Sequence, residues 1–262
     1  MNSFKLTIAV LMLGGFVCCP KASAGNLKGI EISSVEISQR LEELIQKGNE
    51  RSLSGDYQGA INYYTQAIKQ NPKNAQAYLK RGIARGELND FQGAIFDYNL
   101  ALEINPRDSQ AFVNRGVARA RLGDKKNAIA DFNQAILINP LDSNTFYNRG
   151  IAYAELGNNQ QAILDFSKSL EINPYDGDTF YNRGAIYLKS NQFAKAVEDF
   201  NRVLAINSDR IDARLYRGIA RGNLGDKKGA IADLEIVARE LRKVGNNLEA
   251  DNVQKIIKEF DS

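Results

Sequence analysis

The chain contains no histidine and no tryptophan among its 262 residues, and it has only two cysteines, Cys18 and Cys19. Nucleophilic triads usually need a histidine base, and common zinc sites are built largely from cysteine and histidine. No glycine-rich phosphate-binding loop is present either. We therefore expect a protein that is not an enzyme and that has no catalytic residue, no metal site and no cofactor. Carboxylate chemistry remains open on composition alone.

An excess of charge of either sign is also lacking. Lysine and arginine number 34, aspartate and glutamate number 31, and the formal net charge is +3 without a long run of like charges. Nucleic acids and anionic membrane surfaces attract strongly basic segments. We therefore expect neither as a partner.

A long apolar run occurs only near the N-terminus. Lys5 precedes an apolar run of twelve residues, Leu6–Val17, and Ala22–Ala24 matches the small-residue cleavage pattern of a secretory signal peptide. Twelve residues are too few for a membrane-spanning helix, which needs about 20. We therefore expect residues 1–24 to be an export signal that is cut after Ala24.

Cleavage at this point removes both cysteines and leaves a mature chain with no integral membrane span. It also removes Lys5 and Lys21, which lowers the net charge from +3 to +1. The expected location is the periplasm or the extracellular space, or the thylakoid lumen if the source is photosynthetic. Lipidation of Cys18 or Cys19 is a minor alternative, because the residues before them fit a lipidation pattern poorly.

Proline is rare, and its spacing reveals a repeat. After Pro20 the prolines are 34 residues apart, and one glycine series and one alanine series keep the same step. A fixed period of this length is typical of repeat proteins. We divide the chain into a segment at 25–40, six units at 41–74, 75–108, 109–142, 143–176, 177–210 and 211–244, and a C-terminal helix within 245–262.

Within a unit the recurring residues are an aromatic at position 4, glycine at 8, alanine at 20, an aromatic at 24, a small residue at 27 and proline at 32. The unit 109–142 shows all of them: Phe112, Gly116, Ala128, Phe132, Ala135 and Pro140. This pattern resembles the tetratricopeptide repeat. The resemblance extends over six units, 204 of the 262 residues, and implies an all-α, right-handed superhelical solenoid of helical hairpins.

The residues themselves favour the same architecture. In the unit 75–108, Asp90 can cap a second helix, and Pro106 ends it because proline cannot continue the hydrogen-bond ladder. We expect the glycine at 8 to face the alanine at 20, and the aromatics at 4 and 24 to pack together. One hairpin cannot bury its apolar faces alone, so neighbouring units must stack. Residues 248–260 place Val253, Ile256, Ile257 and Phe260 on one face of a capping helix.

Five units carry arginine at position 7 and aspartate at position 23. In an antiparallel hairpin these positions lie near the same level and on the same side of the seam. We expect a structural ion pair within each unit, because a pair repeated five times has no unique site to serve. The expected pairs are Arg81–Asp97, Arg115–Asp131, Arg149–Asp165, Arg183–Asp199 and Arg217–Asp233.

The resemblance implies that the first helices of the units line a concave groove. There, position 5 supplies an apolar track that packing does not require, and position 6 supplies a row of asparagines. An asparagine amide offers a donor and an acceptor, which matches a peptide bond of an extended chain. The alternative is that these asparagines are exposed residues copied with the repeat. The candidate groove residues are Asn49, Lys80, Asn114, Tyr147, Asn148, Tyr181, Asn182 and Tyr216.

One binding mode of the resembled family is excluded. The two-carboxylate clamp that holds acidic C-termini of chaperones needs lysine at position 5 and basic residues at positions 2 and 6. Ile45 stands in place of that lysine, and Asp178 and Asp212 occupy position 2. We expect an exported, non-catalytic scaffold for a protein or peptide, such as an assembly or adaptor factor. The alternative is a structural bridge or self-associating solenoid that uses its convex face.

Overall fold

The computed structural model describes residues 34–261, and within this range the chain forms thirteen α-helices and no β-strand. The all-α class expected from the sequence is confirmed. The expected export signal, its cleavage after Ala24 and both cysteines lie outside the described residues. None of the described helices combines the length and the apolar character that crossing a membrane requires.

Each unit contains a first and a second helix. The helices are α1 (Ser34–Leu53), α2 (Tyr57–Gln70), α3 (Ala75–Glu87), α4 (Phe91–Ile104), α5 (Ser109–Arg121), α6 (Lys125–Ile138), α7 (Ser143–Glu155), α8 (Asn159–Ile172), α9 (Gly177–Lys189), α10 (Phe193–Ile206), α11 (Ile211–Asn223), α12 (Lys227–Lys243) and α13 (Asn247–Asp261).

Local sequence explains where the helices begin. Asp90 caps α4 by accepting a hydrogen bond from the Gly93 amide, and Asp108 caps α5 by accepting one from the Ala111 amide. Side-chain oxygens at these sites satisfy amides that a helix start leaves unpaired. Between the two helices of a unit, one residue adopts a positive φ, which glycine tolerates best. The residues with this geometry are Gly55, Asn89, Gly123, Gly157, Asn191 and Gly225.

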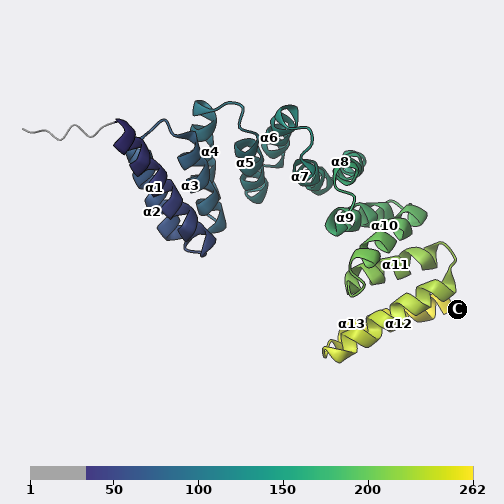
Figure 1. Ribbon diagram of the computed structural model, residues 1–262. Helices are drawn as coiled ribbons and strands as arrows, with labels where there is room; N and C mark the ends of the chain where they lie inside the picture. Colours follow the sequence, from purple (N-terminus) through teal and green to yellow (C-terminus); the bar gives the residue numbers. More distant parts are fainter. Residues whose placement is uncertain (1–33, 262) are drawn as a thin grey trace, which may run out of the picture.

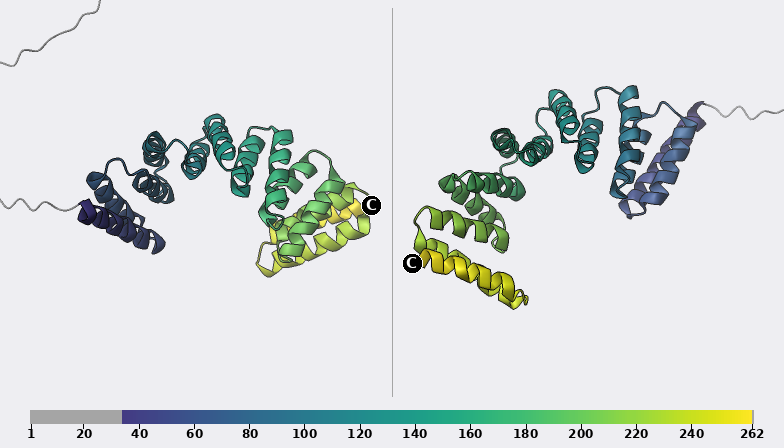
Figure 2. Two further views of the ribbon diagram at one scale, coloured as in Figure 1. Left: turned by 45° about the horizontal axis from the view of Figure 1, so that its top comes forward. Right: turned by 180° about the vertical axis from the view of Figure 1, so that it is seen from behind.

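The hairpins stack into a curved row. Figure 1 shows an open arc from α1 to α13, and the two further views in Figure 2 show the same curvature. Successive helices pack against each other, and α3 contacts α5, α5 contacts α7, and α9 contacts α11. In Figure 1, α5, α7 and α9 lie on the inner side of the arc, with α6, α8 and α10 outside. The first helices therefore supply the concave surface.

In the seam within a hairpin, the glycine at position 8 has a close aromatic neighbour. A Cβ atom added at Gly150 would lie 2.8 Å from Phe166 Cε1, and one at Gly82 would lie 2.6 Å from Tyr98 Cε1. The glycine at position 8 thus lies directly against the aromatic at position 24, and the ring fills the space that the glycine leaves. In the last unit a Cβ atom added at Gly218 would also lie 3.3 Å from the carbonyl oxygen of Ala230, the alanine at position 20.

The last unit is closed by α13. Val253 and Ile257 are buried against Leu234 and Val237 of α12, in a cluster that Ile256 and Phe260 join as partly buried residues. The phenyl ring of Phe260 also covers Gly222, where an added Cβ atom would clash with it. The apolar face predicted for this helix is therefore the face that packs on the solenoid.

Candidate partner-binding surface

The geometry of the concave surface depends on a row of arginines at position 7. Arg149 donates to Asp165 through Nε at 2.8 Å and Nη2 at 2.7 Å, and Arg81 donates to Asp97 in the same way at 2.9 and 2.6 Å. These two-bond, charge-assisted pairs have a fixed geometry. The aspartates of all five units are almost fully buried: Asp97, Asp131, Asp165, Asp199 and Asp233. The structure brings each of the five arginine–aspartate pairs together.

The remaining guanidinium nitrogen of each arginine reaches the preceding unit, which the sequence reasoning missed. Arg149 Nη1 donates to Asn133 at 2.6 Å, and Arg115 Nη1 donates to Asn99 at 2.7 Å. The other three bonds join Arg81 to Thr65, Arg183 to Ser167 and Arg217 to Asn201. The signal was available, because a polar residue stands 16 positions before each arginine, as the aspartate stands 16 after it.

The residue at position 11 determines which further side chain lies beside each buried arginine–aspartate pair. In three units it is a second arginine, and Arg85 donates to Asp97 at 2.9 Å. In the fourth and fifth units it is a tyrosine, and the ring centroids of Tyr153 and Tyr187 lie 6.0 and 5.8 Å from the guanidinium carbons. Burial raises the pKa of the Asp199 carboxyl, and the hydrogen bonds and charge of Arg183 oppose that rise. In the fourth and fifth units an aromatic ring therefore lies beside the ion pair, where the other three of these units have a second arginine.

The residues of position 5 are part of the packing. Val113 is buried, and the Tyr147 ring lies 5.9 Å from the Phe166 ring and the Tyr181 ring 6.0 Å from the Phe200 ring, centroid to centroid. The expectation that packing does not require this apolar track is therefore wrong. Burial also raises the pKa of the Tyr147 and Tyr181 hydroxyls.

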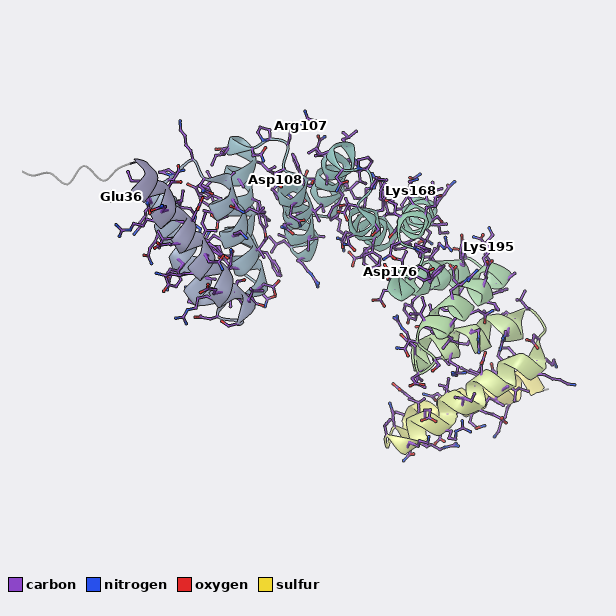
Figure 3. The ribbon with its side chains drawn as sticks, viewed as in Figure 1. Glu36, Arg107, Asp108, Lys168, Asp176 and Lys195 are labelled. Atoms are coloured by element: carbon purple, nitrogen blue, oxygen red, sulfur yellow. The ribbon has the colours of Figure 1, made fainter. Side chains whose placement is uncertain are left out.

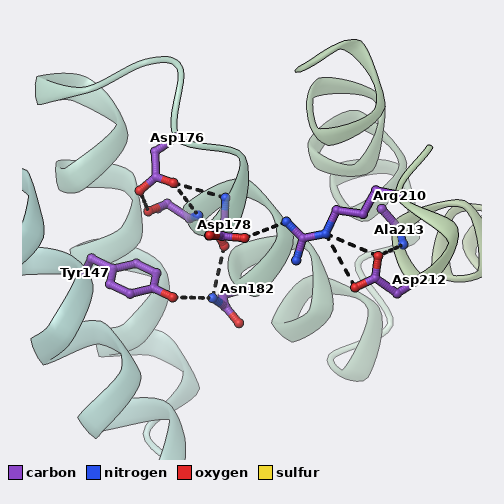
Figure 4. Close-up of polar contacts among 8 residues, drawn as sticks. Tyr147, Asp176, Asp178, Asn182, Arg210, Asp212 and Ala213 are labelled. Atoms are coloured by element: carbon purple, nitrogen blue, oxygen red, sulfur yellow. Dashed lines mark hydrogen bonds and ion pairs between the residues drawn. The ribbon is translucent and has the colours of Figure 1, made fainter. Parts of the chain in front are cut away.

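The asparagines of position 6 are not equivalent. Asn182 Nδ2 donates to the Tyr147 hydroxyl at 3.1 Å and to the Asp178 carbonyl at 3.0 Å (Figure 4). Asn114 Oδ1 accepts from Gln110 at 3.2 Å, while its Nδ2 is buried without a partner. Asn148 lies between them, half-buried, with no hydrogen-bond partner among the described residues. Of the three, Asn148 has the amide that is most free to bind another molecule.

The structure groups the other candidates at two places. Asn49 and Lys80 line a recess of about 420 Å³ between α1 and α3, where Asn49 accepts a hydrogen bond of 3.0 Å from the Tyr64 hydroxyl. Tyr216 lies far along the groove, and its ring centroid is 5.9 Å from that of Tyr181. Tyr181 and Tyr216 therefore stack on each other across the last two units, whereas the Tyr147 ring packs against Phe166 within the fourth unit.

A charged crosslink beside this stack was also missed. Arg210 Nη1 donates to Asp178 at 2.6 Å and its Nε donates to Asp212 at 3.2 Å, while its guanidinium carbon lies 4.3 Å from the Tyr181 ring centroid (Figure 4). Arg210 stands where four earlier units have a helix-capping asparagine or aspartate. That departure from the repeat was visible in the sequence.

The two ends of the concave surface differ in polarity. A recess of about 430 Å³ between α3 and α5 is lined by Glu87, Asn89, Tyr98, Asn114 and Arg121 beside apolar residues. At the other end, a cleft of about 460 Å³ between α11 and α13 is mainly apolar, with Leu215, Ile219, Leu241, Val253 and Ile256 in its lining. The surface therefore mixes polar and apolar groups near its N-terminal end and is mainly apolar near its C-terminal end.

The outer face carries many of the charged residues. Figure 3 shows Arg107, Lys168 and Lys195 toward the outside of the arc and Asp176 toward its inside. Several large apolar side chains are also exposed on second helices, among them Phe96 and Leu164, both at position 22. Within residues 34–261, no cluster of three or more Cys, His, Asp or Glu side chains is arranged to hold a metal ion.

Sequence models described as tetratricopeptide repeat match residues 46–111, 109–140, 143–176 and 177–210. No curated protein matches the chain in a sequence comparison.

Solved structures with the same fold include PilF of Pseudomonas aeruginosa, with a TM-score of 0.73 and 18% identity over 84% of this chain and 98% of that one. PilW, described as a widely conserved type IV pilus biogenesis factor, gives a TM-score of 0.68 and 22% identity over 84% and 99%. YrrB, described as having an unusual peptide-binding site, gives 0.57 and 23% over 68% and 95%. At these identities the likeness shows the fold alone.

Proposed function

Because the chain belongs to the tetratricopeptide repeat family, we propose that it is a non-catalytic scaffold that binds an extended segment of a partner protein along its concave groove. The observation that carries this proposal is the Asn148 side chain, half-buried at the middle of the groove with an unpartnered amide. An amide in this state can donate to a carbonyl oxygen and accept from an N–H of the same peptide bond.

The surroundings of Asn148 suit an extended chain. Toward the N-terminus lie two recesses that combine hydrogen-bonding side chains with apolar ones, and toward the C-terminus lie Tyr147, the stacked rings of Tyr181 and Tyr216, and then the apolar cleft. Ligand sites commonly combine apolar walls with a few placed polar groups. A bound segment with polar residues at one end and apolar residues at the other matches this gradient.

The setting of this activity is also part of the proposal. This part of the proposal is supported by the match of residues 1–24 to an export signal, and PilW, which shares the fold, is described as a pilus biogenesis factor. We propose that the protein acts as an assembly or adaptor factor in the compartment that it enters. Its partner is a protein or peptide and not the acidic C-terminus of a chaperone.

The test begins with random peptides displayed on phage and selected against the purified protein. The affinity of the selected peptides is then measured by calorimetry for the wild type, for Asn148→Ala and for the triple variant Asn114→Ala, Asn148→Ala, Asn182→Ala. One lost hydrogen bond is worth about 1 kcal/mol, so we expect about a fivefold loss for the single variant and about a hundredfold loss for the triple variant. Asn182 is expected to contribute least, because it is already hydrogen-bonded within the protein.

Asn62→Ala is the matched control, because Asn62 is an exposed asparagine of α2, the second helix of the first unit. It should leave the affinity unchanged. If Asn148→Ala binds the selected peptides as tightly as the wild type while folded, the groove assignment is wrong.

A second candidate is a bridging or self-associating role for the convex face. It is favoured by Phe96 and Leu164, which are 59% and 56% exposed at the same position of two different units. Sedimentation equilibrium of the wild type and of Phe96→Ser with Leu164→Ser tests it. A wild-type oligomer that the double variant dissociates supports this role, whereas a wild-type monomer at all concentrations excludes self-association.

A further inference from the structure

Two tyrosines at the same repeat position have different hydroxyl environments. The Tyr64 hydroxyl, on α2, donates to Asn49 Oδ1 at 3.0 Å. Tyr98 is its counterpart on α4, but position 9 of that unit is Ile83, which offers no acceptor. Among the described residues no side chain or carbonyl takes the place of Asn49, although Tyr98 is only 3% exposed. Its hydroxyl therefore reaches the floor of the recess between α3 and α5 without a partner.

A second unpartnered group lines the same recess. Asn114 Nδ2, on α5, is buried and has no acceptor, while the amide oxygen accepts a hydrogen bond from Gln110 on the same helix. Buried polar groups are nearly always hydrogen-bonded in folded proteins, so each exception needs an explanation. Because Tyr98 and Asn114 both line the recess, each can offer a hydrogen-bond donor to a group that enters it.

Charges of both signs line this recess, namely Glu87 and Arg121. Burial raises the pKa of the Tyr98 hydroxyl, and the negative charges of Asp97 and Glu87 raise it further. Asp97 is fully buried by Arg81 and Arg85, whereas Glu87 is exposed and lines the recess. Because the opposite charges of Glu87 and Arg121 line the recess together, it has no excess of either charge, and a neutral group with both an acceptor and a donor matches it.

We propose that the recess formed by Glu87, Tyr98 and Asn114 is a specificity site for a carboxamide side chain, glutamine or asparagine, of the bound segment. The ligand's amide oxygen accepts from the Tyr98 hydroxyl and from Asn114 Nδ2, and its amide N–H donates to the Glu87 carboxylate. The recess has a volume of about 430 Å³ and is open on the concave side, so it admits a side chain of this size. This inference rests on the proposed function, since it names one residue class of the segment that the groove holds.

The experiment uses the peptides selected on the wild-type protein. We expect enrichment of glutamine or asparagine at one position, and about a fivefold weaker affinity when that residue is replaced by leucine or by glutamate. Tyr98→Phe should weaken this preference, because it removes one of the two donors to the ligand's amide oxygen and nothing else. The fold tolerates the change, since Phe132 and Phe166 occupy the same position in later units. Glu87→Gln should restore binding of the glutamate peptide.

Tyr64→Phe is the matched control, because it removes a hydroxyl at the equivalent position of the preceding unit. It should leave the preference for the carboxamide intact. Unchanged preference in Tyr98→Phe, or enrichment of acidic residues in the wild-type selection, would overturn this inference while leaving the groove proposal standing. Failure of the groove proposal gives a different result, namely no selected peptide or peptides whose binding ignores Asn148→Ala.

Discussion

Arg149 Nη1 donates a hydrogen bond of 2.6 Å to Asn133 Oδ1, and this bond joins the fourth unit to the third. The same guanidinium is paired with Asp165 inside its own unit. One side chain therefore fixes both the shape of a hairpin and its position relative to the neighbouring hairpin. The same joint is repeated at five unit boundaries.

The pair within the unit is tested by a double-mutant cycle. Arg149→Ala and Asp165→Ala should each destabilise the protein by about 3 kcal/mol, because each leaves its partner buried without compensation. The double variant should cost less than the sum of the two single variants. Urea unfolding measures all three free energies. Strictly additive effects would show that the two side chains are not coupled.

The joint between units is tested separately. Asn133→Ala should destabilise the protein by about 1 kcal/mol, the value of one hydrogen bond. The effect should disappear when Arg149 is already alanine, since the bond then has no donor. Asn62→Ala provides the baseline for losing an exposed asparagine on a second helix, and an equal cost for the two alanine variants would contradict the joint.

Glycine is needed at position 8 because an aromatic ring occupies the space of a side chain there, and not because the backbone adopts an unusual conformation. Gly150→Ala places a Cβ atom 2.8 Å from Phe166 Cε1, so we expect overpacking to cost about 1–3 kcal/mol. Gly177→Ala is a suitable comparison, because its Cβ atom would meet Ile206 at an ordinary 3.7 Å. Thermal unfolding of both variants decides the point, and a Gly150→Ala protein as stable as Gly177→Ala would contradict the packing described here.

The raised pKa of the Tyr98 hydroxyl predicts a loss of stability in alkali. The unfolded chain releases this proton near pH 10, whereas the folded chain holds it to a higher pH. Above about pH 10 the folded state therefore binds more protons, and the free energy of unfolding falls as pH rises. Tyr98→Phe should make that fall less steep. The measurement is urea unfolding between pH 9 and 11, and identical slopes for the two proteins would be the contrary result.

Export is tested at the N-terminus of the protein recovered from its source. The account predicts that it begins at Gly25, with residues 1–24 removed, and that deletion of Lys5 slows processing. N-terminal sequencing measures both. Recovery of a chain that retains Met1 would contradict the prediction, and a lipid on Cys18 or Cys19 would support the minor alternative.

Much of the fold was predictable because the repeat fixes it. The 34-residue step of proline, glycine and alanine gave the helical hairpins, and counting levels across a hairpin led to pairs such as Arg183 and Asp199. The bond from Arg183 to Ser167 was not predicted, because the counting was confined to a single unit. The same confinement hid the contact between Tyr147 and Asn182, which belong to neighbouring units.

The candidate groove was less predictable for a physical reason. A residue on the concave side can pack against the next unit or remain available to a partner, and the repeat pattern alone does not distinguish these two roles. Val113 is buried and Asn182 is hydrogen-bonded, whereas Asn148 at the equivalent position is unpartnered. Among the described residues the Tyr98 hydroxyl has no partner, because position 9 of its unit is isoleucine and not asparagine. Such a difference between units is not visible in the residues that all units share.

The central claim is that the concave surface holds an extended segment. The most direct test is photo-crosslinking of a selected peptide that carries a benzophenone group, followed by mass spectrometry of the crosslinked protein. The account predicts crosslinks to the groove side of α5, α7 and α9, with Asn148 or its neighbours among the labelled residues. Crosslinks confined to α6, α8 and α10 on the outer side of the arc would contradict it.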